Sequence, residues 1–283
     1  MNIFQSEFFL KSKFHWNFIK EIEYLKSWEL LAKQYKNRDK NAYLTKKIPK
    51  IIHQVWIGPK KMPLKYKNWM HSWRELNPEY EYRFWTDKEI NKLNMINKKK
   101  YEISQNVGTK SDIARYEILN NFGGIYVDTD FECLKKIPEF LHYYDFVSSI
   151  IFDTKPCIAN GFIMSQKKSK FLEEIISKLN LSQNKNIIND TISNSGPGLL
   201  TREYFNLKQS IRKRSLILPT DFFYPYPNFL LNNKFNKKEM IEKNSIAIHH
   251  WEMSWMKGNL LKRLLKKVFF IFKKLRFNII NKI

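Results

Sequence analysis

Short apolar runs alternate along the chain with segments in which apolar residues recur every three or four positions. The runs are rich in β-branched and aromatic residues and are bounded by Gly, Pro, Asp or Asn, which is typical of buried β-strands. We expect strands within 50–58, 80–85, 125–127, 144–152, 160–165, 215–219 and 245–251.

The intervening segments have the spacing of amphipathic helices. Helices are predicted over 64–77, after Thr86, over 110–122 and over 169–179. Thr86 with Glu89, and Thr109 with Asp112, have the spacing of a capping box at a helix start. Since strands alternate with helices, the pattern predicts an α/β fold with a mostly parallel central sheet.

The pattern divides the chain into three parts. Residues 1–45 form an N-terminal helical segment, which we expect to be an appended helical hairpin followed by a polar linker. Residues 46–257 hold the alternating strands and helices of the main domain. Residues 258–283 form a basic amphipathic C-terminal tail without an acidic residue.

Composition narrows the class of protein. The chain has 283 residues, of which 43% are hydrophobic and 16% aromatic, so it is too apolar for a disordered protein. Its net charge of +23 attracts anions such as acidic lipid, nucleic acid or phosphorylated substrates, although an AT-rich genome would also raise the lysine content. The two cysteines form no disulfide framework, and neither a secretory signal nor a membrane-spanning stretch is evident, so we expect a cytoplasmic protein.

Two aspartates follow the predicted strand 125–127 directly. Ligands of open α/β sheets bind outside the carboxyl ends of the strands, which is where Asp128 and Asp130 lie. Residues one apart on an extended chain face the same way, so both carboxylates should point to one place. Two close anions repel unless a cation lies between them, and carboxylate oxygens suit Mg²⁺ or Mn²⁺. An Asp-x-Asp triplet also occurs in many surface loops.

Asp112 and Arg115 lie on one face of the helix that precedes this strand. If both side chains were exposed, they would form a surface ion pair that contributes little to folding stability. In the crevice they would instead hydrogen-bond the hydroxyl groups of a sugar.

Four separated motifs, "IPKIIHQVWIG", "KSDIARYEILNNFGGIYVDTDFECL", "SGPG" and "HHWEMSW", resemble glycosyltransferase family 32 over about residues 46–257. This family includes bacterial capsule and lipopolysaccharide transferases and fungal mannosyltransferases. The pattern is also similar to the glucosyltransferase domains of large clostridial toxins. The resemblance implies a GT-A fold, Rossmann-like in its nucleotide-sugar binding, and a retaining transfer of a hexose from a nucleotide sugar.

The resemblance also implies roles for single residues. Trp56 would stack on the nucleotide base, and Asp112 and Arg115 would hold the hydroxyl groups of the donor sugar. Tyr126 would frame the nucleotide, and Asn160 would flank the sugar. Asp128 and Asp130 would hold the metal ion, with Asp128 also near the ribose and sugar. The catalytic set is then Asp112, Arg115, Asp128 and Asp130.

The family's fold takes one more metal ligand from near the end of the domain. The spacing of the toxin-like relatives is not reproduced here, so His250 and Ser254 are assigned this role, with His249 and Glu252 as alternatives. Trp255 would lie over the diphosphate. Ordinary hydrogen bonds at a strand end would explain the two histidines equally well.

The basic tail completes the predicted function. Leu and Phe residues of 258–283 would enter the headgroup boundary of an anionic membrane while Lys and Arg contact the lipid charges. We expect a Mn²⁺- or Mg²⁺-dependent enzyme on the cytoplasmic face of the inner membrane. It would move a hexose, most simply from a UDP-sugar, to a saccharide or lipid-linked glycan in surface polysaccharide or lipopolysaccharide synthesis, without a nucleic-acid partner.

Two other functions compete with this prediction. In a phosphatase of the haloacid dehalogenase type, Thr or Val would stand two residues after the second aspartate, where this chain has Glu132, and the strand would be N-terminal. In a non-catalytic basic module that binds membrane or nucleic acid, the two aspartates would only cap a strand. Metal-dependent hydrolysis of a nucleotide sugar separates the transferase from both.

Overall fold

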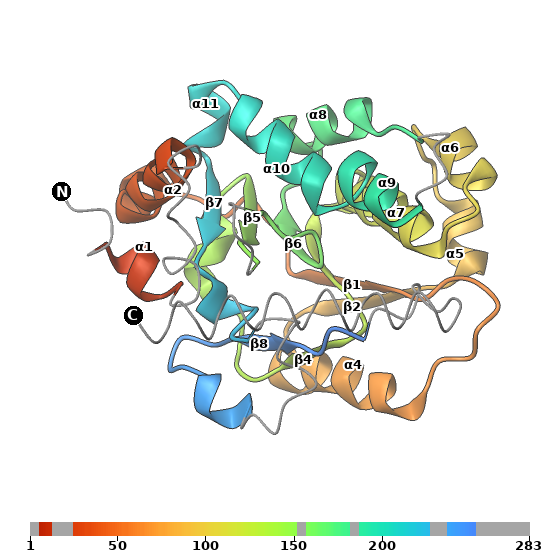
Figure 1. Cartoon of the computed structure of the whole chain (residues 1–283). Helices are drawn as coiled ribbons and strands as arrows, with labels where there is room; N and C mark the ends of the chain where they lie inside the picture. The colour runs from red at the N-terminus through yellow and green to blue at the C-terminus, as the bar shows by residue number, and fades with distance from the viewer. Residues whose placement is uncertain (1–5, 13–24, 152–156, 182–186, 227–236, 253–283) are drawn as a thin grey trace, which may run out of the picture.

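The structure is a computed structural model, and it describes residues 6–12, 25–151, 157–181, 187–226 and 237–252 (Figure 1). The basic tail 258–283, Ser254 and Trp255 therefore lie outside the described residues. In the described part of the chain, none of the helices combines the length and the apolar character needed to span a bilayer.

A six-stranded sheet with the order β2-β1-β3-β6-β5-β7 forms the centre of the molecule. Five of its strands run parallel and only β6 runs the opposite way, because β6 pairs antiparallel with both β3 and β5. The predicted mostly parallel α/β sheet is confirmed, and the reversed strand was not predicted. The strands are β1 Ile51–Val55, β2 Glu81–Trp85, β3 Gly124–Val127, β5 Phe146–Ser149, β6 Phe162–Ser165 and β7 Ser215–Leu218.

Helices cover both faces of this sheet. Figure 1 shows α7 to α10 above the sheet and α4 below it. The helices are α1 Glu7–Leu10, α2 Leu25–Lys36, α3 Arg38–Asn41, α4 Leu64–Leu76, α5 Asp87–Lys92, α6 Lys98–Ile103, α7 Val107–Phe122, α8 Lys170–Lys178, α9 Ile187–Asn194, α10 Pro197–Asn206 and α11 Gln209–Arg212. Within the described residues, short 3-10 helices occur at η4 Glu139–Tyr143, η5 Thr220–Phe222 and η7 Lys237–Met240.

A second sheet of two strands brings the end of the described chain back to the centre. β4 Phe131–Cys133 pairs antiparallel with β8 Ala247–His249, with Phe131 opposite His249. α4 packs on β4, and the indole N–H of Trp73 donates to the carbonyl of Phe131 at 3.0 Å. The sequence predicts a strand at 245–251 but not that it leaves the main sheet.

Two glycines make the sharp step from α7 into β3. Gly123 ends the helix with φ 68°, and Gly124 follows with φ 102°, in a region that L side chains avoid. A Cβ on Gly124 would lie 2.5 Å from the carbonyl oxygen of Ile51 on the neighbouring strand. The step therefore requires glycine, and it aims β3 so that its carboxyl end meets the crevice beside α7.

The start of α7 differs from the prediction. The capping box of Thr86 with Glu89 is present at α5 and is confirmed. That of Thr109 with Asp112 is wrong, because α7 starts three residues earlier, at Val107, and Asn106 caps it by accepting from the amides of Gly108 and Thr109. Asp112 is thus inside the helix, where it does not serve as part of a cap, and it lines the cavity described below.

The described N-terminal helices belong to the main hydrophobic core. Trp28, Leu31 and Tyr35 of α2 are at most 2% exposed and join the same core cluster as the central strands. The side chain of Gln34 donates to the carbonyls of Arg212 and Ser215 at the edge strand β7. These helices pack on the sheet edge as part of one body, while the boundary at residue 45 stays a prediction.

Candidate active site

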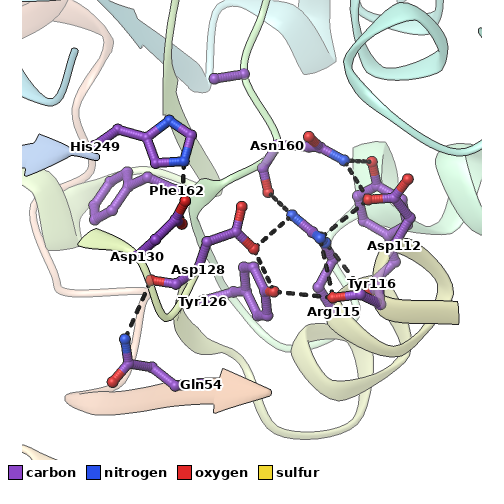
Figure 2. Close-up of polar contacts among 12 residues, drawn as sticks. Gln54, Asp112, Arg115, Tyr116, Tyr126, Asp128, Asp130, Asn160, Phe162 and His249 are labelled. Atoms are coloured by element: carbon purple, nitrogen blue, oxygen red, sulfur yellow. Dashed lines mark hydrogen bonds and ion pairs between the residues drawn. The ribbon is translucent and has the colours of Figure 1, made fainter. Parts of the chain in front are cut away.

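A cavity of about 340 Å³ lies at the carboxyl ends of β1 and β3. Its walls come from the loop after β1, the first turns of α7, the loop 128–130, the residues before β6, and the segments that precede α10 and follow β8. The predicted residues Trp56, Asp112, Arg115, Asp128, Asp130 and Asn160 all line it. Tyr126 lies directly behind them, since its hydroxyl reaches Asp128 (Figure 2).

Asp128 is fixed by its surroundings on one side only. Its Oδ1 accepts from the Tyr126 hydroxyl at 2.6 Å and pairs with the Arg115 guanidinium at 3.2 Å. Its backbone carbonyl accepts from the side-chain amide of Gln54 at 3.3 Å and from the amide of Phe131 at 3.1 Å. No hydrogen bond from the described residues reaches Oδ2, so this oxygen is available to a ligand.

Asp130 is held by the segment that follows β8. Its Oδ1 lies 3.1 Å from Nε2 of His249, and its Oδ2 accepts from the amide of Glu252 at 2.9 Å. Burial works to raise the pKa of Asp130, but His249 and these hydrogen bonds outweigh it and lower the pKa. Burial raises the pKa of Asp128, with Arg115 opposing and the Asp130 carboxylate adding to the rise. The two neighbouring acids are thus held in different environments.

Asp128, Asp130 and His249 form a group that can hold a metal ion. One ligand atom from each lies within 4.8 Å of the others. The two carboxylates suit Mn²⁺ or Mg²⁺, and the imidazole nitrogen favours the transition metal, so the donor set fits Mn²⁺. The open Oδ2 of Asp128 is consistent with this fit, because a bound ion would occupy it.

The third member of this group differs from the residue first assigned. His250 points away: its Nε2 donates to the carboxylate of Glu132 at 2.9 Å, and its ring stacks on Trp69 with centroids 4.0 Å apart. Adjacent side chains of an extended chain face opposite ways, so only one of the two imidazoles can reach the Asp130 carboxylate. The geometry places His249, the alternative, in the site in place of His250.

Asp112 and Arg115 form a buried pair and not a surface ion pair. Their side chains are 7% and 6% exposed, and Arg115 Nη2 lies 3.1 Å from Asp112 Oδ1. Burial raises the pKa of Asp112 to about 6, although Arg115 lowers it. Arg115 also donates to the carbonyl of Asn160 at 2.6 Å and lies over the ring of Tyr126. One guanidinium therefore joins Asp112 on α7 to Asp128 after β3.

Several site residues were not assigned from the sequence. The Ser195 hydroxyl donates to Asp112 Oδ2 at 2.8 Å, while the predicted residue Asn160 donates to Oδ1 at 2.8 Å through its side-chain amide. Ser195 opens the quoted motif "SGPG", so this signal was present. Gln54 and Trp251 also contribute, the latter as a cavity wall with φ 55°. Tyr224 gave no signal, because it belongs to a segment that lacks a motif.

Residues 63–147 match the family model described as the glycosyltransferase sugar-binding region containing a DXD motif. Over these residues the chain is similar to a glycosyltransferase sugar-binding region. Its DXD triplet is Asp128-Thr129-Asp130, the loop between β3 and β4. This match confirms the resemblance predicted from the motifs over residues 63–147, and glycosyltransferase is the enzyme class that those motifs predict.

Curated relatives resemble the sugar-binding region and its surroundings. An inositol phosphoceramide mannosyltransferase 3 from Schizosaccharomyces pombe is 32% identical over 142 residues, which are 47% of this chain and 37% of the relative. An uncharacterized glycosyltransferase of Acanthamoeba polyphaga mimivirus is 30% identical over 51% of this chain and 61% of the relative. The matches thus span less than two thirds of either relative.

The fold is similar to that of a solved toxin domain. The catalytic domain of alpha-toxin from Clostridium novyi aligns over 87% of both chains with a TM-score of 0.53 and 12% identity. At this identity the likeness concerns the fold alone. The predicted GT-A fold, an α/β sheet with helices on both faces, is confirmed.

Proposed function

We propose that the chain is a metal-dependent glycosyltransferase that moves a hexose from a nucleotide diphosphate sugar to a glycan or lipid-linked acceptor. The observation that carries the proposal is the group Asp128, Asp130 and His249 at the wall of a cavity that also exposes Asp112 and Arg115. One end of the cavity can bind a metal ion and the other can bind a sugar. This arrangement suits a nucleotide sugar, in which the bond that breaks joins the diphosphate to the sugar.

Each end has a defined task. Asp128, Asp130 and His249 would hold a divalent ion, whose positive charge would stabilise the departing diphosphate. Asp112, Arg115 and Asn160 orient the hydroxyl groups of the donor sugar, and Arg115 fixes the carboxylate of Asp128 at the same time. Trp56 at the other wall receives the base of the nucleotide, since its ring lines the cavity.

We further propose that the configuration of the sugar is retained without a protein nucleophile. Asp112 is the acid nearest to the expected sugar position, yet its two oxygens already accept hydrogen bonds from Ser195 and Asn160, and Oδ1 also forms an ion pair with Arg115. A carboxylate so engaged is a poor nucleophile. The acceptor hydroxyl then attacks from the side on which the diphosphate departs.

The acceptor and the location remain those expected from the sequence. We propose a UDP-sugar as donor, a saccharide or lipid-linked glycan in surface polysaccharide synthesis as acceptor, and attachment to the cytoplasmic face of a membrane through residues 258–283. The mannosyltransferase names among the relatives add GDP-mannose to the donors worth testing.

A hydrolysis panel tests the proposal without knowledge of the acceptor. UDP-glucose, UDP-galactose, their N-acetyl forms and GDP-mannose are incubated with the full chain and Mn²⁺, and release of free sugar is measured. We expect hydrolysis of one donor, loss on addition of EDTA, and recovery with excess Mn²⁺.

Asp130→Asn is the first variant for this panel. It should lower Mn²⁺-dependent hydrolysis at least about 100-fold, because the amide removes a charge from the ion site. Glu132→Gln is its matched control, since Glu132 lies two residues on but pairs with His250 outside the group. Full activity in Asp130→Asn, or no hydrolysis of any donor by the wild type, would contradict the proposal and favour the non-catalytic basic module.

A further inference from the structure

Tyr224 lines the active-site cavity, and its buried hydroxyl has no hydrogen-bond partner among the described residues. The residue is 2% exposed. A buried hydroxyl without a partner costs stability, on the order of 1–3 kcal/mol, so its retention calls for an explanation. The backbone amide of Phe162 is directed at the hydroxyl oxygen. The hydroxyl still lacks an acceptor for its own proton among the described residues.

The ring of Tyr224 is held so firmly that its hydroxyl has little freedom to turn elsewhere. It packs edge to face on Phe131 and His249, with ring centroids 5.3 and 5.5 Å away, and tilted on Trp251 at 5.6 Å. Its backbone amide donates to the carbonyl of Thr220 at 2.7 Å, which fixes the segment after η5. The hydroxyl is therefore a preorganised donor.

Gly161 shows where this donor points. A Cβ on Gly161 would lie 2.7 Å from Oδ2 of Asp128 and 3.2 Å from the Tyr224 hydroxyl. The two oxygens are thus at most about 6 Å apart and look onto one small space that a side chain would fill. Asp128 Oδ2 is the oxygen left open to a metal ion, so this space adjoins the metal-binding end of the cavity.

We propose that the Tyr224 hydroxyl donates a hydrogen bond to an oxygen of the donor's diphosphate. The Asp128 carboxylate can only accept hydrogen bonds and cannot stabilise a nearby diphosphate oxygen, which is also anionic. Such an oxygen needs the metal ion on one side and a hydrogen-bond donor on the other. The Tyr224 hydroxyl is such a donor on that side of the cavity. This inference rests on the proposed function and adds a diphosphate-binding residue to it.

Tyr224→Phe tests the inference, because it removes one oxygen and keeps the ring. Thermal unfolding is recorded without ligand and with UDP or GDP plus Mn²⁺, and the dissociation constant is measured by calorimetry. We expect the ligand-free variant to be as stable as the wild type or more stable, and its affinity for the nucleoside diphosphate to fall about tenfold.

Tyr144→Phe is the matched control. The Tyr144 hydroxyl is buried but donates to the carbonyl of Arg38 at 2.7 Å, away from the cavity. This variant should lose stability and keep its affinity for the nucleoside diphosphate, the reverse of Tyr224→Phe.

Three results would overturn the inference. They are a marked loss of stability in ligand-free Tyr224→Phe, an unchanged affinity for UDP and GDP, and a loss of affinity confined to the whole nucleotide sugar. The last would mean that the hydroxyl contacts the sugar. If the wild type binds no nucleoside diphosphate with Mn²⁺, the proposed function itself fails, which is a separate outcome.

Discussion

At the scale of single residues, the carboxylates of the cavity differ in whether their oxygens are bound by the protein or left open to a ligand. Asp112 has both oxygens engaged by protein donors, whereas Asp128 keeps Oδ2 open. The motif residues Asp112, Arg115, Asp128 and Asp130 could be predicted to converge, because each lies at a known end of a predicted element. The choice between His249 and His250 could not, since it depends on the register of β4 against β8.

Gly161 gives a test at the scale of one methyl group. Its alanine variant would place Cβ 2.7 Å from Asp128 Oδ2 and 3.2 Å from the ring of Phe131. We expect Gly161→Ala to displace Asp128, to lower Mn²⁺-dependent nucleotide binding about tenfold or more, and to cost about 1–3 kcal/mol of unfolding free energy. Calorimetry and urea unfolding check these values. Wild-type binding together with wild-type stability would show that the space is not as tight as described.

At the scale of elements, β1 carries a buried histidine, His53, whose hydrogen bonds join the strand to its neighbours. His53 is fully buried; its Nε2 donates to the carbonyl of Gly123, and its Nδ1 accepts from the indole N–H of Trp85. Only the neutral ring can make both bonds, because protonation would set two N–H groups against each other. Burial lowers the pKa of His53 to about 4.

This histidine predicts how stability depends on pH. In the unfolded chain the ring takes up a proton below about pH 6.5, whereas in the folded protein it stays neutral until about pH 4. The unfolded state thus binds more protons in this window, and folding stability falls as the pH is lowered through it, by about 2 kcal/mol at pH 5. Between pH 7.5 and 8.5 the ring is neutral in both states and contributes no change.

Two measurements check this prediction. Urea unfolding at pH 7.5 and pH 5 gives the change in free energy, and NMR of the imidazole shows its state directly. We expect the His53 signal to remain that of a neutral ring at pH 5. A His53 signal that titrates near pH 6.5 in the folded protein would refute the explanation.

Strands and helix ends were predicted correctly where a single local sequence pattern determines them. The strands of the main sheet and the cap at Thr86 follow from apolar runs and from a capping box. The reversed direction of β6 and the separate sheet of β4 and β8 depend on long-range pairing, which local patterns do not encode. The start of α7 was misplaced because Asn106 offered a better cap than Thr109.

At the scale of the molecule, the N-terminal helices share the core of the sheet. Leu31 is 1% exposed among core residues, whereas Leu44 is fully exposed. We expect Leu31→Ala to cost about 2–5 kcal/mol in a single unfolding transition, and Leu44→Ala to change the unfolding free energy by less than about 0.5 kcal/mol. Urea unfolding followed by tryptophan fluorescence measures both. Two separate transitions in Leu31→Ala would restore the predicted appended segment.

The basic tail sets a prediction about where the molecule acts. Each basic residue near an anionic surface contributes about 1 kcal/mol, so removal of residues 258–283 should release the protein from vesicles rich in phosphatidylserine. Sedimentation with such vesicles measures this, and neutral phosphatidylcholine vesicles are the control. Equal binding by the shortened and full chains to the anionic vesicles would reject the membrane anchor. Donor hydrolysis should be unchanged by the deletion.

The pairing of β4 with β8 has a consequence for the order in which the protein becomes competent. Asp130 and His249 stand 119 positions apart in the sequence, and the pairing of β4 with β8 brings the two side chains together. During synthesis, a nascent chain would form most of its central sheet before the histidine emerges from the ribosome. The complete metal-binding group is therefore formed last during synthesis. A chain that terminates before His249 should fold but should lack Mn²⁺-dependent activity.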